Sequence, residues 1–216
     1  MTPFSPRLLK GGIVQLDPHT AQVLRVIALQ YNPDTVTRTL RAQAAGADGG
    51  DRSAALRLKG VAVETIRVEA ELDATDRLER PGANADTVAF GLHPQLAALE
   101  SLVQPRAADL QTNENLAASG VLEILPAEAP LTLFVWSRQR VVPVRVTELT
   151  VTEEAFDAAL NPIRARVGLG LRVLSVDDLG FGHRGGTLFM SHLRSKEALA
   201  ARAGSAALSA LGPQVV

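Results

Sequence analysis

Cysteine is absent from this sequence of 216 residues, and aromatic residues make up only 4% of it. Without cysteine the chain has no disulfide bond, no thiolate metal ligand and no cysteine nucleophile. An excess of charge is also missing, because 22 basic residues face 23 acidic ones and the net charge at pH 7 is -1. We therefore expect no nucleic-acid partner, since binding to phosphates needs a basic surface.

Long apolar runs are missing as well. A membrane-spanning helix needs about 18 consecutive apolar residues, and no such run occurs. Residues 1–12 also lack the apolar stretch of a signal peptide. Hydrophobic residues at 46% and charged residues at 21% are typical of a folded chain. We therefore expect a cytoplasmic protein without a membrane partner.

Two segments alternate between apolar and polar residues with a period of two. From Ile163 to Val173 the odd positions are apolar, and the even positions hold arginine or glycine. From Ile66 to Asp73 apolar residues alternate with charged ones. Successive side chains of a β-strand point to opposite faces of the sheet, so this pattern predicts two half-buried strands.

Two hairpins are predicted from the remaining strand-like segments. Residues 23–31 are apolar at nearly every position, which predicts a strand covered on both faces. The turn residues Asn32-Pro33-Asp34 then lead into residues 36–43, so we expect a hairpin over 23–43. Residues 131–137 and 141–151 flank Arg138-Gln139-Arg140 and predict a second hairpin.

Helices are expected in three places and glycine-rich loops in two. The helices are predicted at 94–103, at 152–160, where acidic residues open the segment and Asn161-Pro162 ends it, and at roughly 188–211. The loops are residues 46–53 and 80–87. The predicted fold is mostly β with peripheral helices (α+β). We expect a single domain over 1–216, with a β core at 11–175 and a loop and helix extension at 176–216.

Sequence patterns that carry chemistry are weak. Gly180, Gly182 and Gly185 match the GxGxxG dinucleotide pattern, but no strand pattern follows the helix, so a glycine-rich connection is the better interpretation. His183 and His192 near Asp177 and Asp178 fit no compact metal template and are predicted to be solvated loop residues. We expect no catalytic residue, no cofactor and no metal site. An enzyme at the 180–186 loop would be favoured only by nucleotide binding.

Three segments occur in an order that is characteristic of one family. They are Leu29-Gln-Tyr-Asn-Pro33, the strand at 58–79, and Arg140-Val-Val-Pro-Val144 followed by residues 153–157, 160–165 and a strand that ends at Val173-Leu174. Together they resemble the tube-type baseplate protein of contractile injection systems and related phage tails. The resemblance covers most of residues 11–175. Members of this family often carry a LysM module that contacts peptidoglycan, and no LysM-like repeat is present here.

The resemblance implies a structural protein with a tail-tube-like β-barrel and a C-terminal helix. It implies a homo-hexameric ring that joins the spike hub to the inner tube and initiates tube assembly. The implied partners are further copies of the chain, the spike hub protein and the inner tube protein, with baseplate wedge proteins as additional candidates. A monomeric small β-barrel that binds a ligand or a peptide is the competing hypothesis.

Five residues are candidates for the subunit interface. Arg164 and Arg166 share one face of the predicted strand, where they meet either a neighbour's carboxylates or solvent. Asn161 and Pro162 either end a helix and lead into that strand or contact a neighbouring subunit. Trp136 is the only tryptophan and is expected to anchor the core or an interface.

Overall fold

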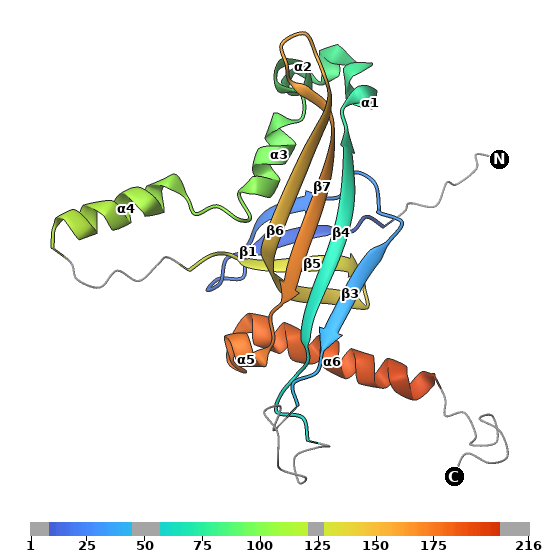
Figure 1. Ribbon diagram of the computed structural model, residues 1–216, viewed down its shortest axis with the longest axis vertical. Helices are drawn as coiled ribbons and strands as arrows, with labels where there is room; N and C mark the ends of the chain where they lie inside the picture. The colour runs from blue at the N-terminus through green and yellow to red at the C-terminus, as the bar shows by residue number, and fades with distance from the viewer. Residues whose placement is uncertain (1–8, 45–56, 121–127, 204–216) are drawn as a thin grey trace.

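The computed structural model describes residues 9–44, 57–120 and 128–203 (Figure 1). Seven strands form one sheet in the order β2-β1-β5-β6-β7-β4-β3, and every neighbouring pair is antiparallel. The strands are β1 (Gly12–Leu16), β2 (Val23–Ala28), β3 (Val36–Arg41), β4 (Val63–Asp73), β5 (Leu131–Ser137), β6 (Arg140–Phe156) and β7 (Pro162–Val173).

The two alternating segments form the adjacent strands β4 and β7, as predicted. Along β7 the odd positions Val167 and Leu171 are at most 1% exposed, and along β4 Ile66 is fully buried. The charged positions between them face solvent. One face of this part of the sheet therefore belongs to the core, and the other is polar.

The long strand β6 connects two parts of the sheet that run in different directions. Its first residues pair with β5, up to the pair Thr132–Val144. The rest pairs with β7 and ends at Phe156–Pro162. A register shift between Val146 and Glu148 marks a β-bulge, which bends a strand. Accordingly, β1 and β5 run across the direction of β4 and β7 in Figure 1.

Helices lie at both ends of the sheet. α1, η2, α2 and α3 follow β4. Of these, α1 and α2 lie near the closed end of the β6–β7 hairpin and α3 leads away from it, whereas α5 and α6 follow β7 at the opposite end (Figure 1). The helices are α1 (Thr75–Leu78), η2 (Pro81–Ala83), α2 (Ala85–Phe90), α3 (His93–Glu100), α4 (Ala107–Ala118), α5 (Val176–Leu179) and α6 (Arg184–Arg202).

One main apolar cluster unites both parts of the sheet with two helices. It includes Ile13 of β1, Phe134 of β5, Leu171 of β7, Leu96 of α3 and Phe189 of α6. A smaller cluster is built on Leu16, Leu131 and Leu133, and Leu179 and Leu188 pack against it. The C-terminal helix is thus packed on the sheet rather than detached from it.

The predicted fold class, mostly β with peripheral helices, is confirmed, and the described strands add that the sheet is open. Its order begins at β2 and ends at β3 without a pairing between them, so these strands do not close the expected barrel within one chain. The hairpin at 131–151 and the helix near 94–103 are present as β5–β6 and α3. α6 begins earlier than predicted, and residues beyond 203 of the predicted helix lie outside the described part.

The predicted hairpin over residues 23–43 is wrong. β2 pairs with β1, and β3 pairs with β4, at opposite edges of the sheet. The turn at Asn32–Asp34 does not join two paired strands, because β2 and β3 each pair with a different strand. β2 is also mostly exposed instead of covered on both faces.

The helix predicted at 152–160 is also wrong. Residues up to Phe156 continue β6, and Asp157 to Asn161 form the turn into β7. Ladder pairing with β7 outweighs the helical preference of the acidic and alanine residues. α4 was not predicted, residues 80–87 contain η2 and part of α2, and the predicted loop at 46–53 lies outside the described residues.

Candidate functional site

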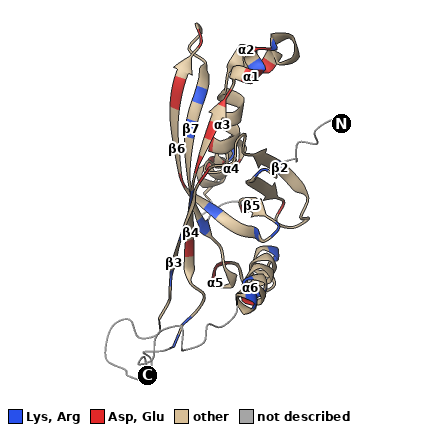
Figure 2. Ribbon diagram, turned by 90° about the vertical axis from the view of Figure 1, so that its right-hand side faces the viewer, with Lys and Arg blue, Asp and Glu red and all other residues tan. Residues whose placement is uncertain are grey.

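Arg164 and Arg166 lie on the polar face of β7 and contact carboxylates of both neighbouring strands. Arg164 is opposite Asp73 of β4, and its Nε donates a hydrogen bond to Asp73 Oδ2 at 3.1 Å. The Arg166 Nε lies 3.4 Å from Glu154 Oε1 and 3.9 Å from Glu71 Oε1. We call these five side chains the ion-pair cluster; Figure 2 shows both signs of charge on β6 and β7.

Solvent reaches most of the ion-pair cluster. The Arg166 side chain is 65% exposed and the Arg164 side chain 54%. Hydrogen bonds from Thr75, with a further contribution from Arg164, lower the pKa of the Asp73 carboxyl, although partial burial acts in the opposite direction. Exposed pairs of this kind contribute about 0–1 kcal/mol to stability. The cluster therefore adds little to the stability of the fold, and its exposed charges are accessible to solvent.

Asn161 and Pro162 close the hairpin next to this cluster. Asp157 Oδ1 accepts hydrogen bonds from the backbone N–H groups of Ala159 and Asn161, both at 2.8 Å, and Asp157 Oδ2 accepts one from Asn161 Nδ2 at 2.9 Å. The hydrogen bonds from Asn161 lower the pKa of Asp157. Pro162 is buried, and its carbonyl accepts a hydrogen bond from the Leu92 N–H. Both residues thus fix the turn that leads into β7, as predicted, but a strand and not a helix precedes this turn. Their contact with a neighbouring subunit stays a prediction.

Trp136 lies apart from the other four candidates. It belongs to β5, near the start of β6, whereas Asn161 and Arg164 lie near the other end of that strand. Its ring stacks on Phe134 with a centroid distance of 5.9 Å and an interplanar angle of 21°. Gly11 approaches the same ring so closely that a Cβ there would lie 2.6 Å from a ring carbon. Trp136 therefore contributes to the core side of the sheet.

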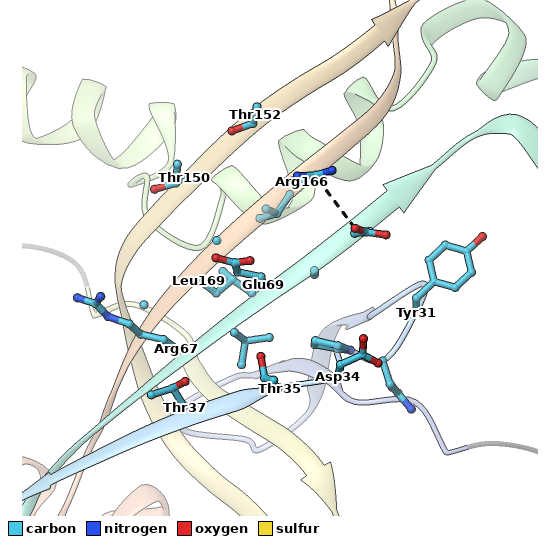
Figure 3. A pocket seen from close by; sticks show the side chains of 18 of the residues that line it. Tyr31, Asp34, Thr35, Thr37, Arg67, Glu69, Thr150, Thr152, Arg166 and Leu169 are labelled. Carbon is cyan, nitrogen blue, oxygen red and sulfur yellow. Dashed lines mark ion pairs between the residues drawn. The ribbon is translucent and has the colours of Figure 1, made fainter.

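A concave region of 1090 Å³ adjoins the ion-pair cluster. Figure 3 shows Arg67 and Glu69 of β4 beside Thr150 of β6, with Tyr31 at the rim. Gly168 contributes to its floor. The residues lining this region include no histidine, serine or lysine, so it holds no nucleophile of these types paired with a histidine base. It can offer hydroxyls, carboxylates and guanidinium groups for binding.

A buried charge cluster connects α6 to the sheet and was not anticipated from the sequence. Glu64 is 5% exposed, and its two oxygens accept hydrogen bonds from Arg38 Nε at 2.6 Å and from Lys196 Nζ at 3.1 Å. Burial raises the pKa of Glu64, but these two cations outweigh it and the net pKa is lowered. The sequence holds only a weak signal for this cluster: Glu64 is a charged residue at a position of β4 that shares the buried face with Ile66 and Val68.

His183 and His192 occupy structural positions. His192 is 8% exposed, so its prediction as a solvated loop residue is wrong. Desolvation, followed by the nearby positive charges, lowers its pKa. The His183 Nδ1 accepts a hydrogen bond from the Gly185 N–H at 3.0 Å and caps α6. Within the described residues, no group of three or more histidine, aspartate or glutamate side chains is arranged to hold a metal ion.

The described helices also bear on membrane association. None of them is both long and apolar enough to cross a lipid bilayer.

Comparison with known proteins finds partly similar chains among the solved structures, including chains of gene transfer agent particles. No protein-family model and no curated protein matches the sequence. One similar chain belongs to the virion of a native gene transfer agent particle, at 11% identity and a TM-score of 0.28. Another belongs to the tail of an empty gene transfer agent particle with C6 symmetry, at 10% identity and a TM-score of 0.30. Each alignment covers 76% of this chain and 90% of the gene transfer agent chain. Similarity at this level assigns neither a family nor a function.

Proposed function

We propose that this chain is a structural baseplate component of a contractile injection system or a related phage tail. Copies of the chain assemble into a ring, which joins the spike hub to the inner tube and initiates tube assembly. Its role is non-catalytic, and it works inside the assembled particle in the cytoplasm. The observation that carries the proposal is the open sheet of the described residues, in which the edge strands β2 and β3 each pair on one side only.

The two edge strands are suited to assembly. β2 and β3 each pair on one side only. Val26 of β2 is 63% exposed and Leu40 of β3 is 52% exposed. An unpaired edge presents N–H and C=O groups that pair readily with another chain. Copies that pair at these edges would extend the sheet between subunits, and a closed ring would leave no edge free.

The sequence resemblance supplies the rest of the proposal. The segments that carry most of it fall on β4, β6 and β7, three adjacent strands of the sheet. These are also the strands that hold the ion-pair cluster. The spike hub, the inner tube and the ring order of six come from this resemblance alone.

The candidate interface residues have separate proposed roles. Arg164 and Arg166 align a neighbouring subunit by exchanging partners between carboxylates of their own chain and those of the neighbour. Asn161 and Pro162 hold the hairpin turn in the shape that the neighbour contacts. Trp136 anchors the part of the sheet next to the β2 edge.

Electron microscopy of the full chain co-expressed with the spike hub and inner tube proteins of its particle tests this function. The expected result is a ring of this chain between spike and tube, with hexameric order. Complete particles that lack the chain, or that hold it only as an isolated monomer, would contradict the proposal.

A monomeric binding module is the second candidate function, and the concave region beside Arg67 and Glu69 favours it. The two functions differ in the mass of the purified chain. Light scattering coupled to size exclusion should show a mass that rises with concentration if the edges pair. A constant monomer mass, combined with absence from particles, would favour the binding module.

A further inference from the structure

An apolar surface is exposed at the closed end of the β6–β7 hairpin. Phe156 and Leu160 of the hairpin are 49% and 76% exposed, and Val88 and Phe90 of α2 are 47% and 54% exposed. We call these four residues the tip patch. Figure 1 shows α2 beside the hairpin end at the top of the molecule. Contiguous exposed apolar residues, aromatic ones above all, mark interaction surfaces.

The tip patch is held in a fixed shape. The Leu92 N–H donates to the Pro162 carbonyl at 2.9 Å, which ties the end of α2 to the hairpin. Leu160 has a φ of +65°, in the left-handed region that a leucine rarely adopts. The turn therefore places an exposed apolar side chain on a strained backbone position. Strain of this kind persists at sites where it serves a function.

A second apolar surface lies on β2. Val23, Leu24 and Val26 are 61%, 48% and 63% exposed, and we call them the β2 patch. Strands that are apolar on both faces are normally covered on both faces. Among the described residues the β2 patch is exposed, so it offers a counterpart for another apolar surface.

The two segments that carry the patches differ in the sign of their charged residues. Residues 153–162 at the hairpin end contain Glu153, Glu154 and Asp157 and no lysine or arginine. Residues 22–30, which include β2, contain Arg25 and no acidic residue. An apolar contact with an acidic rim on one side and a basic rim on the other fits the usual anatomy of a protein interface.

We propose that the tip patch of one copy docks on the β2 patch of the next copy. This inference rests on the proposed ring function and adds one side-chain contact between neighbouring copies to the pairing of the edge strands. The two patches are different surfaces of one molecule, so the contact is head-to-tail, which is the kind of interface that generates rings. The partner is therefore a second copy of this chain.

A substitution at Leu160 separates docking from folding. Asn tolerates the left-handed backbone better than leucine does, so Leu160→Asn should leave the melting temperature unchanged or raise it. The same change removes the most exposed apolar side chain of the tip patch. We expect at least a tenfold weaker self-association of the full chain in sedimentation analysis. Leu199→Asn, at a 43% exposed position on α6, is the control and should associate normally.

Cysteine cross-linking tests the contact directly, because the natural chain has no cysteine. The full chain with Leu160→Cys and Val26→Cys is co-expressed with the spike hub and inner tube proteins and oxidised mildly. A ladder of covalent multimers that a reductant reverses is expected. The control pair, Leu160→Cys with Leu199→Cys, should give no such ladder.

The outcomes distinguish this inference from the function on which it rests. Rings without a ladder for the Leu160–Val26 pair would overturn the docking inference and leave the ring function intact. Normal self-association of Leu160→Asn would overturn it as well. Absence of any ring or multimer would overturn both.

Discussion

Arg164 and Asp73 face each other across the β4–β7 ladder although 91 residues separate them along the chain, and the Arg164 Nε lies 3.1 Å from Asp73 Oδ2. The strand period of two puts Arg166 on the same face, where it meets Glu71 and Glu154. The opposite face of the same strand is closed by core residues. Substitutions on the two faces should therefore fail in different ways.

Charge reversal on the polar face should prevent assembly and leave the fold intact. Arg164→Glu with Arg166→Glu brings two new carboxylates next to three existing ones, and exposed charges of this kind change stability by about 0–1 kcal/mol per pair. We expect a soluble chain with native circular dichroism, and particles in which the tube is missing or the spike is not joined. Electron microscopy of co-expressed particles provides the measurement; normal particles would show that this face is merely solvated.

Truncation on the buried face should affect folding instead. Leu171 is 1% exposed, so Leu171→Ala leaves a cavity and should lower the free energy of unfolding by about 2–5 kcal/mol. Leu40→Ala, at a 52% exposed position of β3, should change it by less than about 0.5 kcal/mol. Urea unfolding of both variants gives the comparison. A Leu171→Ala chain with unchanged stability would be incompatible with the observed burial.

The strands β4 and β7 could be predicted because a period of two is a local property of the chain. Arg164 and Arg166 could likewise be assigned to one face. Asp73 and Glu71 could not be assigned as their partners, because Asp73 lies 91 residues from Arg164 and only the folded register brings β4 alongside. Glu154 could not, because it lies in the segment predicted as a helix. The sequence therefore predicts the two arginines of the ion-pair cluster but not its three carboxylates.

The predictions that were wrong have the opposite origin, because pairing between distant strands outweighed the local sequence preference. The residues Asn32–Asp34 look like a hairpin turn, yet β2 and β3 find partners at opposite edges of the sheet. The acidic residues Glu153 and Glu154 look like a helix start, yet they extend β6 along β7. Buried Glu64 was missed because its cations, Arg38 and Lys196, come from β3 and α6.

Loss of the Glu64 charge should weaken the attachment of α6. Glu64→Gln leaves Arg38 and Lys196 without their shared carboxylate in a partly buried site. Breaking a buried pair costs about 3–5 kcal/mol, and we expect about 3 kcal/mol because both cations are partly solvated. Glu71→Gln is the control, since its side chain is 69% exposed and 3.9 Å from Arg166. Chemical denaturation should show a large effect for the first variant and almost none for the second.

Stability should fall on mild acidification because of His192. Desolvation lowers its pKa in the folded chain below the ordinary value of 6.5, so between these two values the unfolded chain binds more protons. Stability therefore rises with pH in this window and falls as the pH is lowered through it. The charged groups near His192 are Lys196, Glu64 and Arg38, and the pKa of Glu64 is itself lowered from 4.5.

Urea unfolding at about pH 7.5 and about pH 5.5 measures this dependence above the range in which the carboxylates titrate. His192→Gln should reduce the difference in unfolding free energy between the two conditions. Leu199→Gln, at a 43% exposed and non-titrating position of the same helix, should leave that difference unchanged. An identical pH dependence in all three chains would mean that His192 is not the responsible group.

The glycine-rich segment before α6 allows a last test, because its two interpretations demand different glycines. If Gly180, Gly182 and Gly185 bound a dinucleotide phosphate, Gly182 would be essential. In the structure a Cβ at Gly182 would meet nothing within 4 Å, whereas a Cβ at Gly186 would collide with the carbonyl oxygen of Gly180. The close approach of the first turn of α6 to Gly180 is therefore what needs a glycine. Gly186→Ala should lower the free energy of unfolding by about 1–3 kcal/mol, and Gly182→Ala should change it by about 0.5 kcal/mol or less. Thermal unfolding of both variants, together with a dinucleotide-binding assay, decides between the interpretations. A Gly182→Ala chain that is folded but loses binding to a dinucleotide would restore the nucleotide-binding interpretation.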